Sequence, residues 1–226
     1  MNTKKFILLS LITASISIFS IETTQSSKPT IIILHGCSSS GKTSVAKELQ
    51  SIYAADHKPF IYLPLDTFLS MLPINWINLT PHGQKCNDLD GLQFITTQKD
   101  SESAPITNIV IGQTIINALR GIIHSIDAFA QCNNNVIFEG AFPVLFFDDI
   151  KLLKRTYTIY IVNVTCDLAI MEDREIKRDG IKGLTRGQYL DPEYHYSNYD
   201  FSVDTSNISS HDAAQQIKTW IATIQS

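Results

Sequence analysis

The sequence lacks an excess of basic residues. It has 18 Lys and Arg against 22 Asp and Glu among its 226 residues, a formal net charge of −4. Lys and Arg gather only locally, around residues 151–155 and 174–186. Proteins that bind nucleic acid regardless of sequence need a long basic stretch or face to neutralise phosphates. The composition therefore argues against a nucleic-acid partner.

Cysteine is scarce as well. The four residues, Cys37, Cys86, Cys132 and Cys166, include no C-x-x-C pair, and the six histidines are scattered. Neither set has the spacing of zinc ligands, so we expect no zinc site. A chain of this length can build a hydrophobic core without cross-links, so we also expect no disulfide framework.

The sequence has no apolar run long enough to be a clear membrane span, which needs about 20 residues. Residues 1–5 are basic, residues 6–21 are apolar with interspersed Ser and Thr, and residues 22–27 are polar. This pattern predicts a secretory signal peptide over residues 1–27, which would contact a membrane only transiently. An uncleaved anchor or a first buried element are the alternatives, and a non-functional segment would leave the protein in the cytoplasm. Residues 28–226 form the predicted folded domain.

The most informative motif that is present follows a short β-branched run at residues 30–34. It reads G-x-x-x-x-G-K-T and is typical of loops that bind the phosphates of nucleotides. Its predicted nucleotide-binding residues are Gly36, Cys37, Ser38, Ser39, Ser40, Gly41, Lys42 and Thr43. The two glycines allow a tight turn that brings backbone N–H groups onto a phosphate chain, and the following helix start favours negative charge.

Within this loop Lys42 would neutralise the β- and γ-phosphates, and the Thr43 hydroxyl would be a ligand of Mg²⁺. Cys37 has two interpretations. Amides at the helix start would lower the pKa of its thiol, whereas the simpler interpretation is a small residue at a permissive position.

Alternating patterns predict the rest of the fold. Apolar strands are expected at residues 59–63, 134–138, 157–164 and 199–203. Helices are expected at residues 44–55, 106–130, 142–155, 168–178 and 210–225, the last capped by Ser210. Residues 74–105 are polar and indicate a long loop or a short hairpin. The sequence thus predicts an α/β fold, a three-layer P-loop NTPase/kinase sandwich with a mostly parallel sheet of about five strands.

Polar residues that follow these strands should gather beside the phosphate loop, at the carboxyl edge of the sheet. Asp66 could accept a hydroxyl proton or simply cap the helix after it. Glu139 could hold Mg²⁺ directly or through water, or be a solvated strand end. Arg174 and Arg178, with Lys177 on the same helix, could close over phosphates or belong to a salt-bridged surface helix.

These stretches resemble the chloramphenicol phosphotransferase-like family of P-loop kinases over about residues 30–220. The similar segments are I-I-L-H-G-C-S-S-S-G-K-T, L-D-T-F-L-S-M-L-P and V-T-C-D-L-A-I-M-E-D-R-E-I-K-R onward to V-D-T-S. The resemblance implies ATP binding by the first segment, a catalytic base at Asp66, and closure over the phosphates by Arg174 and Arg178. It also implies that Cys166 is a packed strand-end residue.

The expected function is therefore an ATP- and Mg²⁺-dependent kinase that phosphorylates a hydroxyl of a small molecule. A nucleoside or nucleotide kinase on the same scaffold is an alternative, as is an exported module that binds nucleotide without turnover. A GTP-dependent switch is not favoured because the N/T-K-x-D guanine motif is missing. The polar insertion at residues 74–105 falls where the acceptor would bind, so the acceptor and the oligomeric state stay open.

Overall fold

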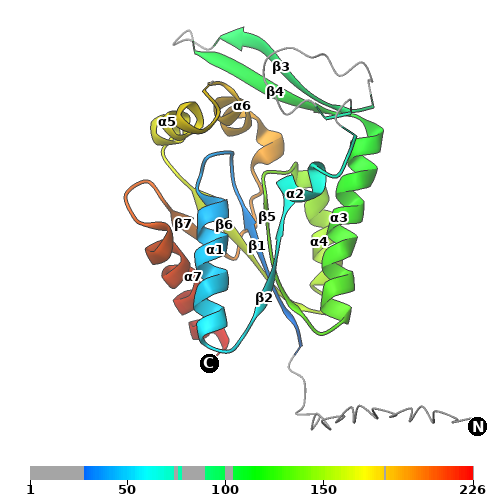
Figure 1. Ribbon diagram of the computed structural model, residues 1–226, viewed down its shortest axis with the longest axis vertical. Helices are drawn as coiled ribbons and strands as arrows, with labels where there is room; N and C mark the ends of the chain where they lie inside the picture. The colour runs from blue at the N-terminus through cyan, green and yellow to red at the C-terminus, as the bar shows by residue number, and fades with distance from the viewer. Residues whose placement is uncertain (1–27, 74–75, 78–89, 100–103, 181, 226) are drawn as a thin grey trace, which may run out of the picture.

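A central sheet of five parallel strands organises the molecule (Figure 1). The computed structural model describes residues 28–73, 76–77, 90–99, 104–180 and 182–225. The spatial order of the strands is β2-β5-β1-β6-β7. Their bounds are β1 Thr30–His35, β2 Phe60–Pro64, β5 Asn135–Gly140, β6 Thr158–Thr165 and β7 Phe201–Asp204. The predicted fold class, an α/β sandwich with about five mostly parallel strands, is confirmed.

Helices cover both faces of this sheet, which explains why its strands are apolar throughout. In Figure 1, α1 (Lys42–Ala55) and α7 (Ser210–Gln225) lie on one side, and α3 (Gln113–Gln131) and α4 (Phe147–Leu153) lie on the other. Alternate residues of β1 enter the two cores: Ile31 and Ile33 pack with α3 and α4, whereas Ile32 and Leu34 pack with α1 and α7.

The prediction of one helix over residues 106–130 is wrong in its first part. Strand β4 (Pro105–Ile111) precedes the helix and pairs antiparallel with β3 (Leu92–Lys99), so a hairpin stands where a loop or hairpin was expected. The apolar residues of β4 fit a helical stripe equally well in sequence. Pairing with β3 decides the strand, and α3 begins only after the extended residue Gly112.

Helices α5 (Leu168–Asp179) and α6 (Leu184–Leu190) lie beneath the hairpin, at the carboxyl edge of the sheet (Figure 1). We call this pair the lid. Helix α5 ends where the sequence predicted, at the left-handed Gly180. Helix α6 was not predicted, because a seven-residue segment has too little periodicity to be recognised. Its position depends on contact with the hairpin, where Thr107 N–H donates to Gly183 O at 2.9 Å.

Smaller corrections concern element ends. The helix predicted at residues 142–155 is a 3-10 turn, Val144–Phe146, followed by α4, and the last strand begins at Phe201. A short helix, α2 (Leu65–Leu69), follows β2, and a 3-10 turn, Pro192–Tyr194, follows α6. Ser209 rather than Ser210 caps α7, because the Ser209 hydroxyl accepts the Asp212 N–H at 3.1 Å.

The predicted signal peptide at residues 1–27 and Cys86 lie outside the described residues. The described cysteines, Cys37, Cys132 and Cys166, are free thiols, and Cys166 is buried. Among the helices of the described ranges, none combines the length and hydropathy that a membrane crossing requires.

Candidate active site

The phosphate loop connects β1 to α1, and its two glycines have backbone conformations that other residues rarely adopt. Gly41 has φ 95° and Gly36 has φ 154°. A Cβ at Gly36 would lie 2.3 Å from the carbonyl oxygen of Val164 on the neighbouring strand. Gly41 is the N-cap of α1, and no side chain of the described residues caps this helix start. The first amides of α1 are therefore available to an anion.

Lys42 lies inside the loop, with 7% of its surface exposed. Its Nζ donates to the carbonyl oxygen of Cys37 at 2.7 Å. Burial lowers the pKa of Lys42, while the negative charge of Glu139 opposes this shift. A buried ammonium group held by a single carbonyl is a strong attractor for phosphate oxygens.

Of the two interpretations of Cys37, the one with a lowered thiol pKa is wrong. Burial raises the pKa of this thiol, although the charge of Lys42 acts in the opposite direction. The simpler interpretation, a small residue that fits the loop, agrees with the structure.

Glu139 and Thr43 meet beside the loop. The Thr43 hydroxyl donates to Glu139 Oε1 at 3.0 Å, and the Tyr62 hydroxyl donates to the same oxygen at 2.9 Å. Glu139 is only 4% exposed, so it is not a solvated strand end. It lies between the neighbouring strands, in register with Leu34 of β1 and Pro64 of β2. The two oxygen atoms predicted to hold Mg²⁺ are thus neighbours.

Asp66 lies on α2, two residues after β2 ends, and it is exposed. Pro64 is the N-cap of α2 and Asp66 stands in the first turn, so the alternative that Asp66 caps this helix is wrong. Its side chain makes no hydrogen bond with a described residue. Its negative charge nevertheless acts to raise the pKa values of Lys42, Tyr62 and Arg178. The carboxylate is therefore within electrostatic range of the phosphate loop.

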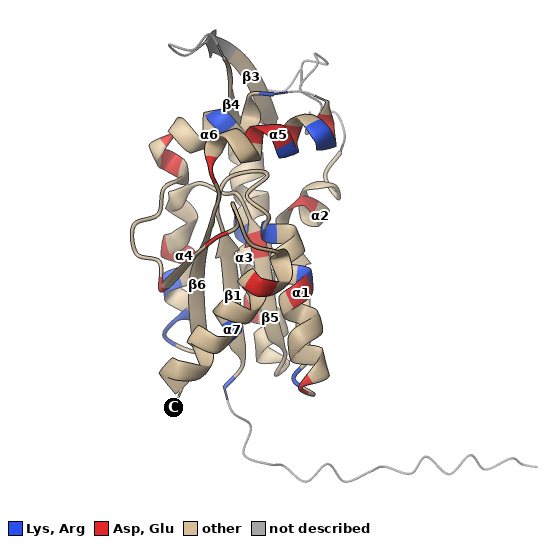
Figure 2. Cartoon of the chain, turned by 90° about the vertical axis from the view of Figure 1, so that its left-hand side faces the viewer, with Lys and Arg blue, Asp and Glu red and all other residues tan. Residues whose placement is uncertain are grey.

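Both predicted arginines contact the loop from α5. Arg174 donates to Ser39 O at 3.3 Å and to Thr205 O at 2.9 Å. Arg178 donates to Ser38 Oγ at 3.1 Å and pairs with Asp179. Figure 2 shows both acidic and basic positions along α5. Two of these acids, Glu172 and Glu175, are buried, and the arginine contacts attach the helix to the phosphate loop, so α5 is not simply a surface helix.

The lid is held together by buried acids. Glu172 binds Arg186 at 2.6 Å and Lys182 at 2.7 Å. Burial alone would raise the pKa of Glu172, but the hydrogen bonds from Arg186 and Lys182 lower it. Arg186 is thus occupied within the lid.

Three residues near the loop were not singled out from the sequence: Tyr62, Thr205 and Gln188. Thr205 donates to Ser40 O at 2.7 Å, and the V-D-T-S segment of the resemblance was its only signal. Gln188 Oε1 accepts the Ser38 N–H at 2.6 Å. Tyr62 belongs to an apolar strand, and a tyrosine there does not reveal which group its hydroxyl will bind.

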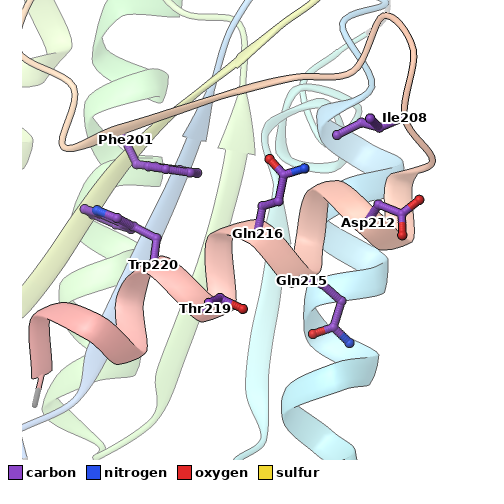
Figure 3. A pocket seen from close by; sticks show the side chains of 7 residues that line it. All are labelled: Phe201, Ile208, Asp212, Gln215, Gln216, Thr219 and Trp220. Carbon is purple, nitrogen blue, oxygen red and sulfur yellow. The ribbon is translucent and has the colours of Figure 1, made fainter.

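Two hollows of different character lie among the described residues. A cavity of about 140 Å³ lies between the loop residue Cys37, the end of β6 and the segment after α6, with Tyr194 and Tyr199 among its lining. A shallow, open depression lies along α7 and β7 (Figure 3), where Phe201 stacks on Trp220. None of the predicted site residues lines this depression.

Comparison with known proteins identifies the family. The family model described as chloramphenicol phosphotransferase-like protein matches residues 29–222. The chain belongs to this family. The resemblance found in the sequence is therefore confirmed, and comparison with curated proteins found no significant match.

Solved structures agree on the fold of this family member. The APS kinase of Mycobacterium tuberculosis in complex with AMPPNP and APS has a TM-score of 0.58 at 16% identity, over 86% of this chain and 98% of that one. A sugar kinase from Janibacter sp. has a TM-score of 0.55 at 15% identity, covering 87% and 95% of the two chains. Shikimate kinase from Acinetobacter baumannii, in complex with shikimate, has a TM-score of 0.53 at 14% identity, covering 88% and 95%. The fold is that of P-loop kinases.

Proposed function

We propose that this protein is an ATP-dependent kinase that transfers the γ-phosphate to a hydroxyl group of a small molecule. The observation that carries the proposal is the cluster at the carboxyl edge of the sheet. An uncapped helix start, the buried Lys42 ammonium and the Thr43–Glu139 pair stand together there. Family membership supports phosphotransfer, and the AMPPNP bound to APS kinase supports ATP as the donor.

In the proposed reaction the acceptor oxygen forms a bond to the γ-phosphorus while the bond to the β–γ bridging oxygen breaks, and ADP leaves. Asp66 takes the hydroxyl proton, for which its exposed carboxylate, without a hydrogen-bond partner among the described residues, is suited. Lys42, Arg174 and Arg178 stabilise the negative charge that spreads over the transferring group. The amides of the loop hold the phosphates in line.

Magnesium fits the oxygen atoms available. Hard divalent cations prefer carboxylate and hydroxyl oxygens, and Thr43 Oγ1 lies 3.0 Å from Glu139 Oε1. No cluster of three or more His, Cys, Asp and Glu occurs in the described part of the chain, so phosphates and water would complete the coordination. When bound, the ion would neutralise phosphate charge.

Replacing Asp66 by Asn tests the proposed base. The exchange keeps the shape of the side chain but removes its ability to take a proton, so we expect turnover to fall by at least about 100-fold. Binding of AMPPNP, measured by calorimetry, should change less than about threefold because Asp66 is not part of the loop. Full activity of D66N on the true acceptor would exclude this role.

The acceptor can be found by measuring ADP release across alcohol-bearing compounds, with nucleosides and nucleotides as one set. Turnover of nucleosides alone would favour a nucleoside kinase. A thermal shift with ATP and Mg²⁺ but no turnover of any compound would favour a silent nucleotide-binding module.

We also propose export directed by residues 1–27, because a basic start precedes an apolar stretch and a polar one. Sequencing the N-terminus of the mature protein tests this. A protein that still begins at Met1 and stays in the cytoplasm would contradict it.

A further inference from the structure

One residue of the phosphate loop, Ser38, is bound by the lid at three points. Its N–H donates to Gln188 Oε1 at 2.6 Å, its carbonyl accepts from Thr185 Oγ1 at 3.4 Å, and its hydroxyl accepts from Arg178 at 3.1 Å. Two of these contacts come from α6 and one from α5. The lid therefore contacts Ser38 through both its backbone and its side chain, and Arg174 adds a contact with Ser39 O.

Gln188 is a buried residue of the lid. Only 4% of its surface is exposed, so its amide oxygen has little access to water. The preceding residue, Gly187, touches β4 so closely that a Cβ there would lie 1.9 Å from Thr107 O. Helix α6 thus has the hairpin on one side and the loop on the other.

The start of α6 is also fixed. The carboxylate of Glu175, on α5, accepts the N–H groups of Gly183 at 3.1 Å and Thr185 at 3.0 Å. Glu175 has no exposed surface. Because this carboxylate joins α5 to α6, a displacement of α6 would also displace Arg178.

The contact at Ser38 does not compete with the anion site. The amides that would hold phosphates belong to the start of α1, where no side-chain cap occurs among the described residues. The Ser38 N–H, which the sequence counted among the nucleotide-binding groups, stands three residues before Gly41 and has a partner on the lid instead. Lid and nucleotide can therefore occupy the loop together.

We propose that Gln188 is a positioning residue that sets the lid against the phosphate loop through the Ser38 N–H. It acts through this amide and through α5, and it brings Arg178 to the transferring phosphate. The catalytic part of this inference rests on the proposed function. The docking part stands apart from it, since it concerns only the attachment of the lid to the loop.

Two substitutions separate the hydrogen bond from side-chain size. Gln188→Met keeps the length of the side chain but removes the acceptor, which leaves the part-buried Ser38 N–H without this partner. Gln188→Glu keeps an acceptor oxygen but adds a negative charge beside the loop. Gln215→Met, the same exchange at an exposed glutamine of α7, is the matched control.

The measurements are amide hydrogen exchange of residues 184–190 and binding of AMPPNP by calorimetry, on the full chain. We expect exchange about tenfold faster in Q188M and nearly unchanged in Q188E and Q215M. Binding of AMPPNP should weaken less than threefold in Q188M and about tenfold in Q188E, because like charges repel there. With an acceptor in hand, Q188M should lower kcat about tenfold with little change in the KM of ATP.

Unchanged exchange and unchanged kcat in Q188M would overturn the proposal, as would equal exchange in Q188M and Q188E. If the wild-type protein turns over no acceptor, the proposed function fails, while the exchange and AMPPNP measurements still decide whether Gln188 docks the lid. Circular dichroism of each variant shows that the fold is kept.

Discussion

His35 is a single buried residue that holds the start of the phosphate loop in place. It is the last residue of β1, directly before the phosphate loop, and it has no exposed surface. The carbonyl of Phe142 can only accept, so His35 Nε2–H donates to it at 2.9 Å. Nδ1 is then the acceptor of the Tyr199 hydroxyl at 2.6 Å. The neutral imidazole therefore ties the start of the loop to two distant segments.

This arrangement predicts a loss of stability in acid. Burial lowers the pKa of His35 to about 4 from 6.5, so between these values the unfolded chain binds a proton that the folded protein does not. The contribution of His35 to stability is present above pH 6.5 and is lost as the pH falls towards 4. From pH 7 to pH 5 it should lower the free energy of unfolding by about 2 kcal/mol.

Urea denaturation at the two pH values measures this effect, with His35→Gln as the comparison. Gln can keep both hydrogen bonds but does not titrate, so its stability should fall about 2 kcal/mol less over the same interval. Equal pH dependence of the two proteins would contradict the assignment.

Among the structural elements, the hairpin of β3 and β4 is in contact with the lid. Helix α6 touches β4 through Gly183 and Gly187, and the Thr107 hydroxyl hydrogen-bonds that of Thr96 on β3. The insertion that the sequence assigned to the acceptor side is therefore attached to the helices that carry the arginines. A change in one element should be transmitted to the other.

Gly187→Ala tests this attachment. Its Cβ would meet the β4 backbone at Thr107 O, which cannot move aside like a flexible side chain. We expect a loss of about 1–3 kcal/mol in the free energy of unfolding, measured by urea denaturation, or detachment of α6 with faster amide exchange in β4.

Gly121→Ala on α3 is the control, because no described atom outside the helix's own backbone lies within 4 Å of a Cβ there. Alanine in a helix interior should stabilise by about 0.5–1 kcal/mol relative to glycine. If Gly187→Ala changes neither the free energy of unfolding nor the amide exchange in β4, then α6 and β4 are not coupled.

At the scale of the whole molecule, two hydrophobic cores share one sheet. Phe138 of β5 packs with α3 and α4, while Ile137 beside it packs with α1 and α7. Because every central strand contributes to both cores, neither can open without disturbing the other. We expect a single cooperative unfolding transition of the described domain.

Nucleotide should stabilise this whole unit. ATP with Mg²⁺ at 100 times its Kd should add about 2.7 kcal/mol, or roughly 5–10 °C in the melting temperature of a domain this size. Lys42→Met should abolish the shift because it removes the buried ammonium from the loop. A calorimetric scan measures both, and an equal shift in K42M would exclude Lys42 as a phosphate ligand.

Features that depend on residues close together in the chain can be predicted from the sequence alone. Gly36, Gly41 and Lys42 lie within one short motif, and the apolar strands predict a sheet buried on both faces. The order of elements then brings Asp66, Glu139 and the arginines of α5 to the same edge, so these candidates could be named before the structure was known. Their chemical roles stay predictions.

Features that rest on partners far away in the chain became known from the folded structure. Residues 105–111 form a strand because β3 offers them hydrogen bonds that a helical stripe cannot reveal. Gln188 lies 150 positions from Ser38, and Tyr62 lies 77 from Glu139. A periodic pattern predicts which face of an element is buried, but it does not predict which polar group of a distant segment that face will contact. That choice is made by packing, when distant segments close on one another.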